Sequence, residues 1–582
     1  MKRSTCLFLS LCLLCLFPFA SCQAPAVFDP NAVGKPLVDI DTSFGAPESE
    51  MFSARDLDRT YDAATAAHVA LNGTSIACTS KAVKVEGANA TILSGGTYIL
   101  SGNLEGEITV FAGDLDKVHL ILDGVDIMSP VAPISVLNAD KVFITLASGS
   151  ENVLISSGGT AIVSGVNVDG AVFSTADLSF GGDGALEVYS LGSHGIVSND
   201  DLVFTGGTYT VEAAGHALKG NDSIRVCGGA AFTLTAEKDG LHSENNDDPT
   251  RGFVYLANGT ITATVGGDGI SASAHMQIRA GSFTLTTGGG HENGKEHESG
   301  FGGGPGGPGG PGGPMPREAT TDTTTSAKGL KAGAGMLIEG GTFTLDAADD
   351  ALHSDTVLVI KGGSFSIKTG DDAVHADLTL AIFGGTLDVS VSYEGLEAEH
   401  VEMLGGNVTL VCEDDGINAA GGNDGSGTGG GFGGDFGHSN DGTGTVNMAG
   451  GVLHMSASGD GIDANGTFTM SGGRLTICGP TSGDTAVLDF DKSAVITGGY
   501  FMGTGSQMMA QTFSDASTQG VIALSVGNQA ANTPLSLSGG AASVSYTPTL
   551  PYQILILSTP DMVKGEEYTV TVGTLSAKFK AY

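Results

Sequence analysis

Apolar and polar residues alternate with a period of two along many short stretches of the chain. In one of them, Phe343 and Leu345 are predicted to point to one side while Thr342 and Thr344 point to the other. This alternation is typical of β-strands. No window between these stretches shows an apolar stripe at helical spacing, which excludes βαβ folds and leucine-rich horseshoes.

The alternating stretch recurs, and most copies begin with a glycine pair. The second residue of that opening lies at positions 207, 229, 259, 281, 341, 363, 385, 406, 451 and 473. Most steps are 21 or 22 residues, and the longer ones equal one period plus an insertion. A unit this short cannot bury its own apolar face, so neighbouring units must stack. The sequence therefore predicts an all-β solenoid, a parallel β-helix with coils of ~22 residues.

The stacked units are predicted to share a buried apolar ladder. Its members are Leu218, Leu241, Ile270, Leu330, Leu352, Val374, Leu396, Ile417 and Ile462. We place the β-helix over residues 69–500 and a β-rich cap over 501–582, because the end strands of a solenoid are open edges. Residues 23–68 are predicted to be a tether.

Glycine-rich insertions interrupt the repeat at 288–325 and 421–444, and a shorter acidic one follows Ser243. Such compositions are flexible and do not build a core. They are either solvated loops or covers for the face from which they leave.

The amino terminus has the features of a secretory signal over residues 1–22. Lys2 and Arg3 precede an apolar run that ends near Ala20, and this run is shorter than the ~20 residues of a membrane span. The residues before Cys22 resemble a bacterial lipobox, so we expect Cys22 to be lipidated. The protein is then exported and anchored to the cell membrane, facing away from the cytoplasm, with plain secretion as the alternative.

The charge balance limits the possible partners. The 582 residues include 64 acidic and 25 basic ones, a formal charge of −39, which excludes direct binding to nucleic acid. We therefore expect the protein to bind cations, or ligands that it reaches through cations. We also expect the chain to be a monomer. Four cysteines beyond Cys22 show no metal-binding spacing and are predicted to be buried, unpaired thiols: Cys78, Cys227, Cys412 and Cys478.

An acidic column is predicted two residues before the apolar ladder. Consecutive coils lie about 4.8 Å apart, and two carboxylates at that distance repel by about 3.5 kcal/mol at an effective dielectric near 20. Calcium suits such a site because it accepts six to eight oxygen ligands. The alternative is that these side chains cap turns by accepting backbone amides. The predicted calcium ligands are Asp239, Asp268, Asp349, Asp350, Asp371, Asp372, Glu394, Asp414, Asp415 and Asp460.

A second, polar column follows one residue after the ladder. It contains side chains that could contact sugar hydroxyls or, in the case of the histidines, a transition metal, or that could simply form a ladder facing solvent. The candidate ligand-binding residues are His242, Lys331, His353, His375, Glu397 and Asn418. Nothing orders a serine, a histidine and an aspartate as a catalytic triad, so no catalytic residue is predicted.

The repeats resemble a known family, the bacterial carbohydrate-binding-domain proteins. The resemblance rests on phrases such as KVHLILDGVDI, KDGLHSENND, ADDALHSD, GDDAVHAD and YQILILSTPD, and it covers roughly residues 69–582. It implies a right-handed parallel β-helix that binds calcium and acidic sugar polymers such as polygalacturonate. His216 and Lys328 replace an acid of the usual phrase, which puts calcium sites at those coils in doubt.

Three function classes follow from the sequence. The favoured one is calcium-dependent, non-catalytic binding of acidic polysaccharide at the cell surface. The same family is similar in fold to calcium-dependent pectate lyases, in which a basic side chain removes a proton beside the uronate carboxylate. Lys331 and Lys219, and less well placed Lys328, are the candidates for that base, although a surface charge is the favoured interpretation of each lysine. The third class is a structural or adhesive surface solenoid.

Overall fold

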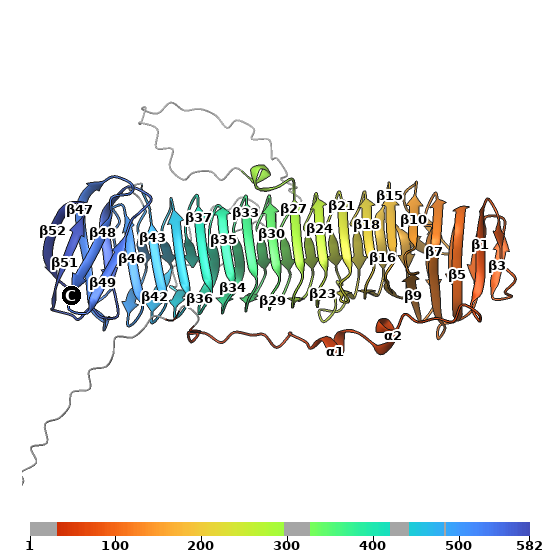
Figure 1. Cartoon of the computed structure of the whole chain (residues 1–582), viewed down its shortest axis with the longest axis horizontal. Helices are drawn as coiled ribbons and strands as arrows, with labels where there is room; N and C mark the ends of the chain where they lie inside the picture. Colours follow the sequence, from red (N-terminus) through yellow and green to blue (C-terminus); the bar gives the residue numbers. More distant parts are fainter. Residues whose placement is uncertain (1–28, 30–31, 296–325, 420–441, 482–484) are drawn as a thin grey trace, which may run out of the picture.

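The protein was analysed as a computed structural model that describes residues 29, 32–295, 326–419, 442–481 and 485–582. Cys22 and most of the two glycine-rich insertions lie outside these residues. Strands form almost all of the regular structure, and the two α-helices are single turns, α1 (Glu48–Met51) and α2 (Ala54–Leu57). The strands stack along the long axis of the molecule in Figure 1. The prediction of an all-β chain with long runs of parallel strands is confirmed.

Three parallel ladders make up the stack, and each repeat contributes one strand to each ladder. In most of the stack a strand therefore pairs with the strand three places later. Ladder A consists of β10 (Glu151–Ser156), β15 (Ala185–Ser190), β18 (Thr208–Ala213), β21 (Ala231–Ala236), β24 (Thr260–Val265), β27 (Ser282–Thr287), β30 (Thr342–Ala347), β33 (Ser364–Thr369), β35 (Thr386–Val391), β37 (Asn407–Cys412), β40 (Val452–Ala457), β43 (Arg474–Cys478) and β46 (Tyr500–Gly505).

Ladder B carries the predicted apolar ladder. It consists of β4 (Asn89–Ile92), β6 (Glu107–Phe111), β8 (Ile134–Asn138), β13 (Gly170–Ser174), β16 (His194–Ser198), β19 (Leu218–Gly220), β22 (Leu241–Ser243), β25 (Ile270–Ala272), β28 (Leu330–Ala332), β31 (Leu352–Ser354), the first halves of β34 (Val374–Ile382) and β36 (Leu396–Met403), β38 (Ile417–Ala419), β41 (Ile462–Ala464) and β44 (Leu488–Phe490). The register pairs each predicted apolar residue with the next, from Leu218 to Ile462, which confirms that prediction.

Ladder C completes each repeat. It consists of β9 (Lys141–Leu146), β14 (Asp177–Gly182), β17 (Asp201–Phe204), β20 (Ser223–Val226), β23 (Phe253–Leu256), β26 (Met276–Ile278), β29 (Gly335–Ile338), β32 (Val357–Ile360), the second halves of β34 and β36, β39 (Gly444–Met448), β42 (Gly466–Met470) and β45 (Ser493–Ile496).

The remaining strands lie at the ends of the stack or in one hairpin. At the amino-terminal end, β1 (Ala67–Gly73), β5 (Gly96–Glu105) and β7 (Lys117–Ser129) are parallel, while β2 (Ile76–Ala77) and β3 (Val83–Glu86) pair antiparallel with β1 and β4. A hairpin joins β11 (Ala161–Val163) and β12 (Val166–Val168). At the other end, β50 (Tyr552–Ser558) pairs antiparallel with β46 and β47 (Val521–Gln529). A separate antiparallel sheet follows, of β48 (Leu535–Gly539), β49 (Ala542–Tyr546), β51 (Glu567–Val572) and β52 (Leu575–Lys580).

The interior of the stack is filled by side chains from alternate strand positions. Phe343 and Leu345 on β30 are each 1% exposed, whereas Thr342 and Thr344 face solvent. Phe343 stacks on Phe365 of the next repeat with ring centroids 4.4 Å apart. Gly363, directly before β33, has a φ of +113°, a backbone conformation that favours glycine, which explains why a glycine precedes the strand.

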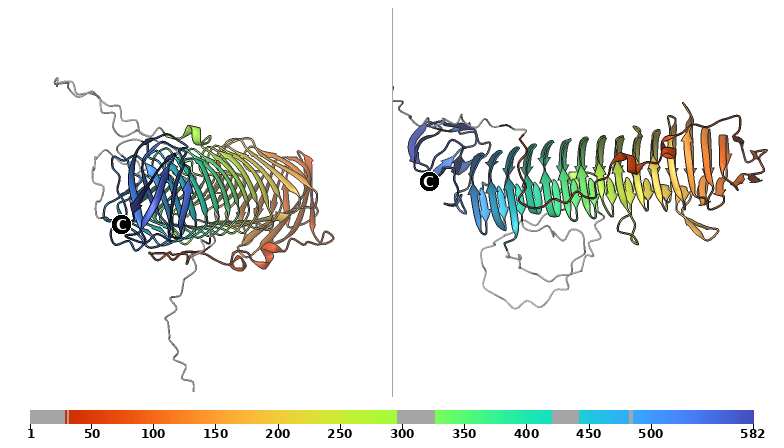
Figure 2. Two further views of the ribbon diagram at one scale, coloured as in Figure 1. Left: turned by 60° about the vertical axis from the view of Figure 1, so that its left-hand side comes forward. Right: turned by 90° about the horizontal axis from the view of Figure 1, so that it is seen from below.

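The segment before β1 lies against ladder C. In Figures 1 and 2 it runs along the stack past α1 and α2, opposite to the order in which the repeats follow one another. The buried Glu402 carboxylate accepts the backbone amides of Leu37 and Val38, at 2.9 and 3.2 Å. Further along, the Arg59 guanidinium donates to Thr205 and to the Phe180 carbonyl oxygen. The tether prediction for residues 23–68 did not anticipate these contacts. Within the described residues, no helix is long and apolar enough to cross a membrane.

Candidate functional site

Two polar columns border the apolar ladder on ladder B. The acidic column comprises His216, Asp239, Asp268, Lys328, Asp350, Asp372, Glu394, Asp415 and Asp460. The polar column comprises Lys219, His242, Ser271, Lys331, His353, His375, Glu397, Asn418 and Asp463, and strand pairing places its members side by side in that order. The predicted alignment of the polar column is therefore confirmed from Lys219 to Asp463.

Carboxylates of the acidic column link one repeat to the next. The Asp239 carboxylate accepts the backbone amide of Asp268 at 2.8 Å, and the Asp268 carboxylate accepts that of Lys328 at 2.8 Å. Asp350 and Asp415 accept the amides of Asp372 and Asp460 in the same way, at 3.1 and 2.5 Å. Amide capping, the alternative to metal binding, is therefore present at these positions, and it acts between repeats.

Three of the aspartates also bind a histidine three residues later. The Asp350 carboxylate is 2.7 Å from Nδ1 of His353, whose Nε2 is 3.0 Å from the Asp355 carboxylate. A nitrogen must carry a proton to donate to a carboxylate, so this arrangement favours the imidazolium form. Burial alone would lower the pKa of His353, but the two carboxylates raise it above its ordinary value. The same contacts recur in Asp239–His242–Glu244 and Asp372–His375–Asp377.

Lys328 supplies a further positive charge inside the acidic column. Its ammonium lies 2.9 Å from the Asp349 carboxylate and 2.6 Å from that of Asp350, and its side chain is 3% exposed. Burial opposes the charged lysine, but the two carboxylates raise its pKa above the ordinary value. Burial likewise opposes the charged Asp350, whose pKa Lys328 and His353 hold well below the usual range. The protein itself neutralises this part of the column.

The acidic column is less well compensated after Asp372. In the part of the chain that the structure describes, no lysine or arginine side chain forms an ion pair with its later members. Burial, followed by repulsion from Glu397 and Asp415, raises the pKa of Glu394 to about 9. Burial and neighbouring carboxylates also raise the pKa of Asp415 to about 8 and that of Asp460 to about 7. Among the described residues, the buried Glu394 Oε2 and Asn418 Oδ1 atoms have no hydrogen-bond partner. Carboxylate oxygens of Asp415, Asp460 and Asp463 lie within 4.8 Å of one another.

A groove of about 700 Å³ opens over the repeats that contain His216, Asp239 and Asp268. In the polar column, the small side chain of Ser271 lies there between His242 and Lys331. Lys238 and Lys331 line the groove beside Asp239 and Asp268. The Lys331 ammonium is 3.4 Å from the Ser326 hydroxyl and 3.9 Å from the Asp268 carboxylate, and about a third of its side chain is exposed. The groove therefore offers two ammonium donors to a ligand, in a lining that also contains five carboxylates.

The structure places some of the predicted site residues in the groove and the others along the acidic and polar columns. Asp239, Asp268, His242 and Lys331 line the groove, whereas Lys219 does not. Asp349, Asp350 and Asp371 come together, as do Asp372, His375 and Glu397, and the latter three are buried. Glu394 and Asn418 are joined by a 3.2 Å hydrogen bond, and Asp414 is partly buried beside Asp415. His353 and His375 are buried, which limits their contact with a ligand.

Some residues of the site were missed by reasoning from the sequence. The acid two residues after each histidine, Glu244, Asp355 or Asp377, completes a phrase D-x-x-H-x-[DE] that the sequence shows three times. That recurrence was a usable signal. Lys238 and Ser326 carry no such signal, because only the stacking of repeats separated by insertions brings them into one groove.

Comparison with known proteins shows relatives of the chain. A family model described as carbohydrate-binding domain-containing protein matches residues 86–373 and 372–545. A protein of that description from Acetivibrio thermocellus is 34% identical over 198 residues, which span 33% of this chain and 69% of the relative. A solved structure titled as the polysaccharide lyase-like protein from C. thermocellum, a gadolinium derivative, is 30% identical and aligns with a TM-score of 0.37 over 39% of this chain and 92% of that one.

Proposed function

The chain belongs to the carbohydrate-binding domain-containing protein family, and from this premise we propose that it binds acidic polysaccharide in a calcium-dependent, non-catalytic manner. The polymer is of the polygalacturonate type, and the site of contact is the groove over His242, Ser271 and Lys331. The formal charge of −39 makes direct contact with a polyanion unfavourable, so local positive charge is required.

The groove is the observation that carries this proposal. Lys238 and Lys331 line it, and His242 adds a positive charge because Asp239 and Glu244 raise its pKa against the effect of burial. The lining also holds five carboxylates, whose repulsion of a polyanion a bound cation would offset, namely those of Glu237, Asp239, Glu244, Asp268 and Asp355. Ammonium and imidazolium groups donate charge-assisted hydrogen bonds to carboxylates. The volume of about 700 Å³ lies within the range of ligand-binding clefts.

The proposed calcium ligands are Glu394, Asp415 and Asp460. Their raised pKa values mean that the carboxylates are partly protonated near neutral pH unless a cation replaces the protons. The orphaned oxygens of Glu394 and Asn418 fit an oxygen-binding cation, as does the absence of cysteine from the column. Calcium would supply positive charge that offsets the acidic face towards a uronate polymer.

For Asp239, Asp349 and Asp350, which were also predicted to bind calcium, we propose a structural role. The oxygens of Asp239 and Asp350 are bonded to histidine, to lysine or to backbone amides, and Asp349 is bonded to Lys328. A calcium ion there would have to displace a positive charge that the protein already provides. We therefore propose that these residues join the repeats and that calcium binds beyond Asp372.

The setting of the site follows from the same proposal. The three parallel ladders would wind as a right-handed parallel β-helix, which is supported by the regular succession of A, B and C strands. The exported protein would be held at the outer side of the cell membrane by a lipid on Cys22, supported by the lipobox-like residues before it. A single chain suffices for the groove, since all of its lining residues come from one chain.

One observation favours a lyase as the second candidate function. Lys331 lines the groove and could reach a bound uronate, as the base of a lyase must. Incubation of the full chain with polygalacturonate, with and without calcium, distinguishes the two functions. Retention that depends on calcium and yields no unsaturated uronate supports binding. Products that disappear in the Lys331→Ala variant support a lyase, and neither retention nor products would contradict both.

A further inference from the structure

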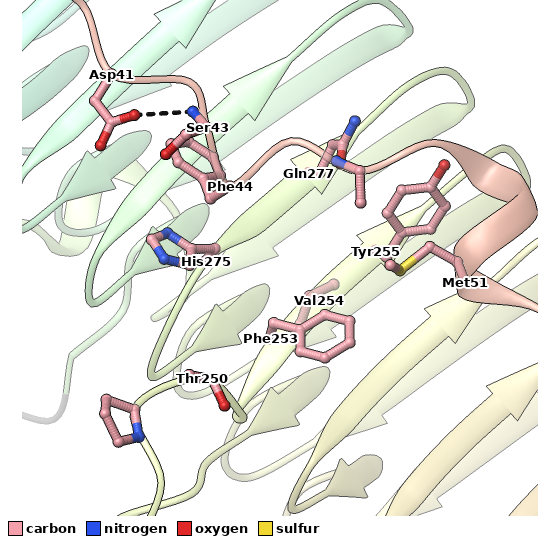
Figure 3. Close-up of a pocket in the computed structure, with 12 residues that line it drawn as sticks. Asp41, Ser43, Phe44, Met51, Thr250, Phe253, Val254, Tyr255, His275 and Gln277 are labelled. Carbon is pink, nitrogen blue, oxygen red and sulfur yellow. Dashed lines mark hydrogen bonds between the residues drawn. The ribbon is translucent and has the colours of Figure 1, made fainter.

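A second cavity, of about 400 Å³, lies between the amino-terminal segment and ladder C. Figure 3 shows Asp41, Ser43 and Phe44 of the segment above His275 of the stack, and Met51 of the segment above Phe253. The loop after β22 contributes Pro249 and Thr250. This cavity is incomplete without the amino-terminal segment, and the groove proposed above does not include it.

Contacts hold both walls of the cavity in place. The Phe44 ring stacks on His275 with centroids 4.4 Å apart and an interplanar angle of 6°. The Gly335 amide donates to Nδ1 of His275 at 3.1 Å, and the buried Gln277 accepts the Ala46 amide at 2.8 Å. The Arg225 guanidinium donates to the Met51 carbonyl oxygen at 2.8 Å. A ligand would therefore enter a site whose shape is already formed.

The two sides of the cavity differ in polarity. Phe253, Met51 and Phe44 offer aromatic and apolar surface, and Phe253 is only half-buried. Asp41, Ser43 and Thr250 provide carboxylate and hydroxyl groups at the rim. A sugar ring has the matching character, since its C–H face packs on apolar or aromatic surface and its hydroxyls form hydrogen bonds at the edge.

The charge of the cavity discriminates between sugars. Its lining includes the Asp41 carboxylate but no lysine or arginine. His275 stays neutral at neutral pH because burial lowers its pKa. A uronate carboxylate would be repelled by Asp41 and would find no lysine or arginine among the lining residues, whereas two lysines line the groove.

We propose that this cavity is a second carbohydrate site that binds one uncharged sugar residue. The inference rests on the proposed polysaccharide-binding function and adds to it a second, chemically distinct subsite. One loop links the two sites, because Glu244 lines the groove whereas Pro249 and Thr250 line the cavity. The Arg251–Asp222 ion pair and the hydrogen bond from Asn245 to Asp222 fix this loop on the stack. A polymer with acidic and neutral residues could contact both.

The test uses D-galactose and D-galacturonate, which differ only at C6, as probes of the full chain. Saturation-transfer NMR and calorimetry should show that galactose binds, and that the Phe44→Ala and Phe253→Ala variants lose at least tenfold in galactose affinity. Their retention of polygalacturonate should stay within about twofold of wild type. The Lys331→Ala control should show the reverse, with weaker retention of polygalacturonate and unchanged galactose binding.

Three results would overturn the inference. They are no binding of galactose, galactose binding that is unchanged in both phenylalanine variants, or a galacturonate affinity at this cavity equal to that of galactose. Thermal unfolding identifies a variant that has lost its fold. Should Phe253→Ala unfold, Phe44→Ala alone decides, because Phe44 lies on the segment outside the stack. If the wild-type chain binds galactose but does not retain polygalacturonate, the proposed function is contradicted and this cavity is not.

Discussion

At the scale of single residues, Lys328 shows how the acidic column is stabilised. The sequence presents it as a departure from the aspartate phrase, yet its ammonium lies between Asp349 and Asp350 with almost no exposure. Removing one partner of a buried ion pair leaves the other charge uncompensated, which costs about 3–5 kcal/mol.

We therefore expect the Lys328→Met variant to lose about 3–5 kcal/mol of its free energy of unfolding. The matched control is Lys331→Met, three residues later, where a partly exposed ammonium lies 3.9 Å from Asp268 and should contribute no more than about 1 kcal/mol. Urea denaturation monitored by circular dichroism measures both. Equal losses in the two variants would contradict the role assigned to Lys328.

The carboxylates beyond Asp372 predict how stability depends on pH. The pKa of Glu394 rises from 4.5 in a model peptide to about 9 in the folded chain, and that of Asp460 from 3.8 to about 7. The folded state therefore binds more protons than the unfolded state between roughly pH 4 and pH 9, and stability falls as pH rises through that window.

In the presence of a chelator, the melting temperature should accordingly be lower at pH 9 than at pH 6. Calcium should reduce this difference, and the Glu394→Gln variant should show a smaller difference that responds less to calcium. Differential scanning calorimetry at several pH values provides the measurement. A melting temperature that does not depend on pH, or a calcium effect that survives in Glu394→Gln, would contradict calcium binding by Glu394.

At the scale of elements, the amino-terminal segment behaves as part of the fold. The Arg59 side chain donates to Thr205 and the Phe180 carbonyl oxygen, and Lys141 pairs with the buried Asp56 at 3.0 Å. Burial lowers the pKa of Arg59 to about 10, so the guanidinium stays charged near neutral pH.

Replacing Arg59 by methionine should release this segment while leaving the ladders intact. We expect limited proteolysis to cut within residues 32–66 at least several-fold faster than in wild type, because local opening exposes the backbone. The Lys84→Met variant serves as a control, since Lys84 is exposed and its ion pair is with the exposed Glu86. Unchanged cleavage in Arg59→Met would mean that these hydrogen bonds do not hold the segment.

The elements also show what could be predicted from the sequence. The repeat of about 22 residues was sufficient to predict parallel strands and the alignment of Leu218 with Ile462, because backbone pairing fixes the register once a unit must stack. The packing of residues 32–66 on ladder C was not predictable, since that segment has no repeat and its contacts are specific side-chain hydrogen bonds. The groove likewise depends on Lys238 and Ser326, which lie 88 residues apart in sequence.

At the scale of the whole molecule, the acidic column is divided along the stack. Towards the amino terminus, Lys328 and the histidines pair with Asp239, Asp350 and Asp372, and lysines line the groove. Burial, with repulsion from nearby carboxylates, still raises the pKa of Asp268 and Asp372 there. Beyond Asp372, carboxylates with raised pKa values face one another. In the proposed function both features are required, because the groove would donate to an anionic polymer and a cation would offset the remaining charge.

The affinity of the full chain for polygalacturonate, measured by affinity electrophoresis over a series of free calcium concentrations, tests this account most directly. We expect the dissociation constant to fall at least tenfold as calcium is added to chelated protein. The Asp415→Asn variant should lose most of that calcium dependence, and Lys331→Ala should bind weakly at every calcium concentration. A dissociation constant that is the same with calcium and with chelator would contradict the account.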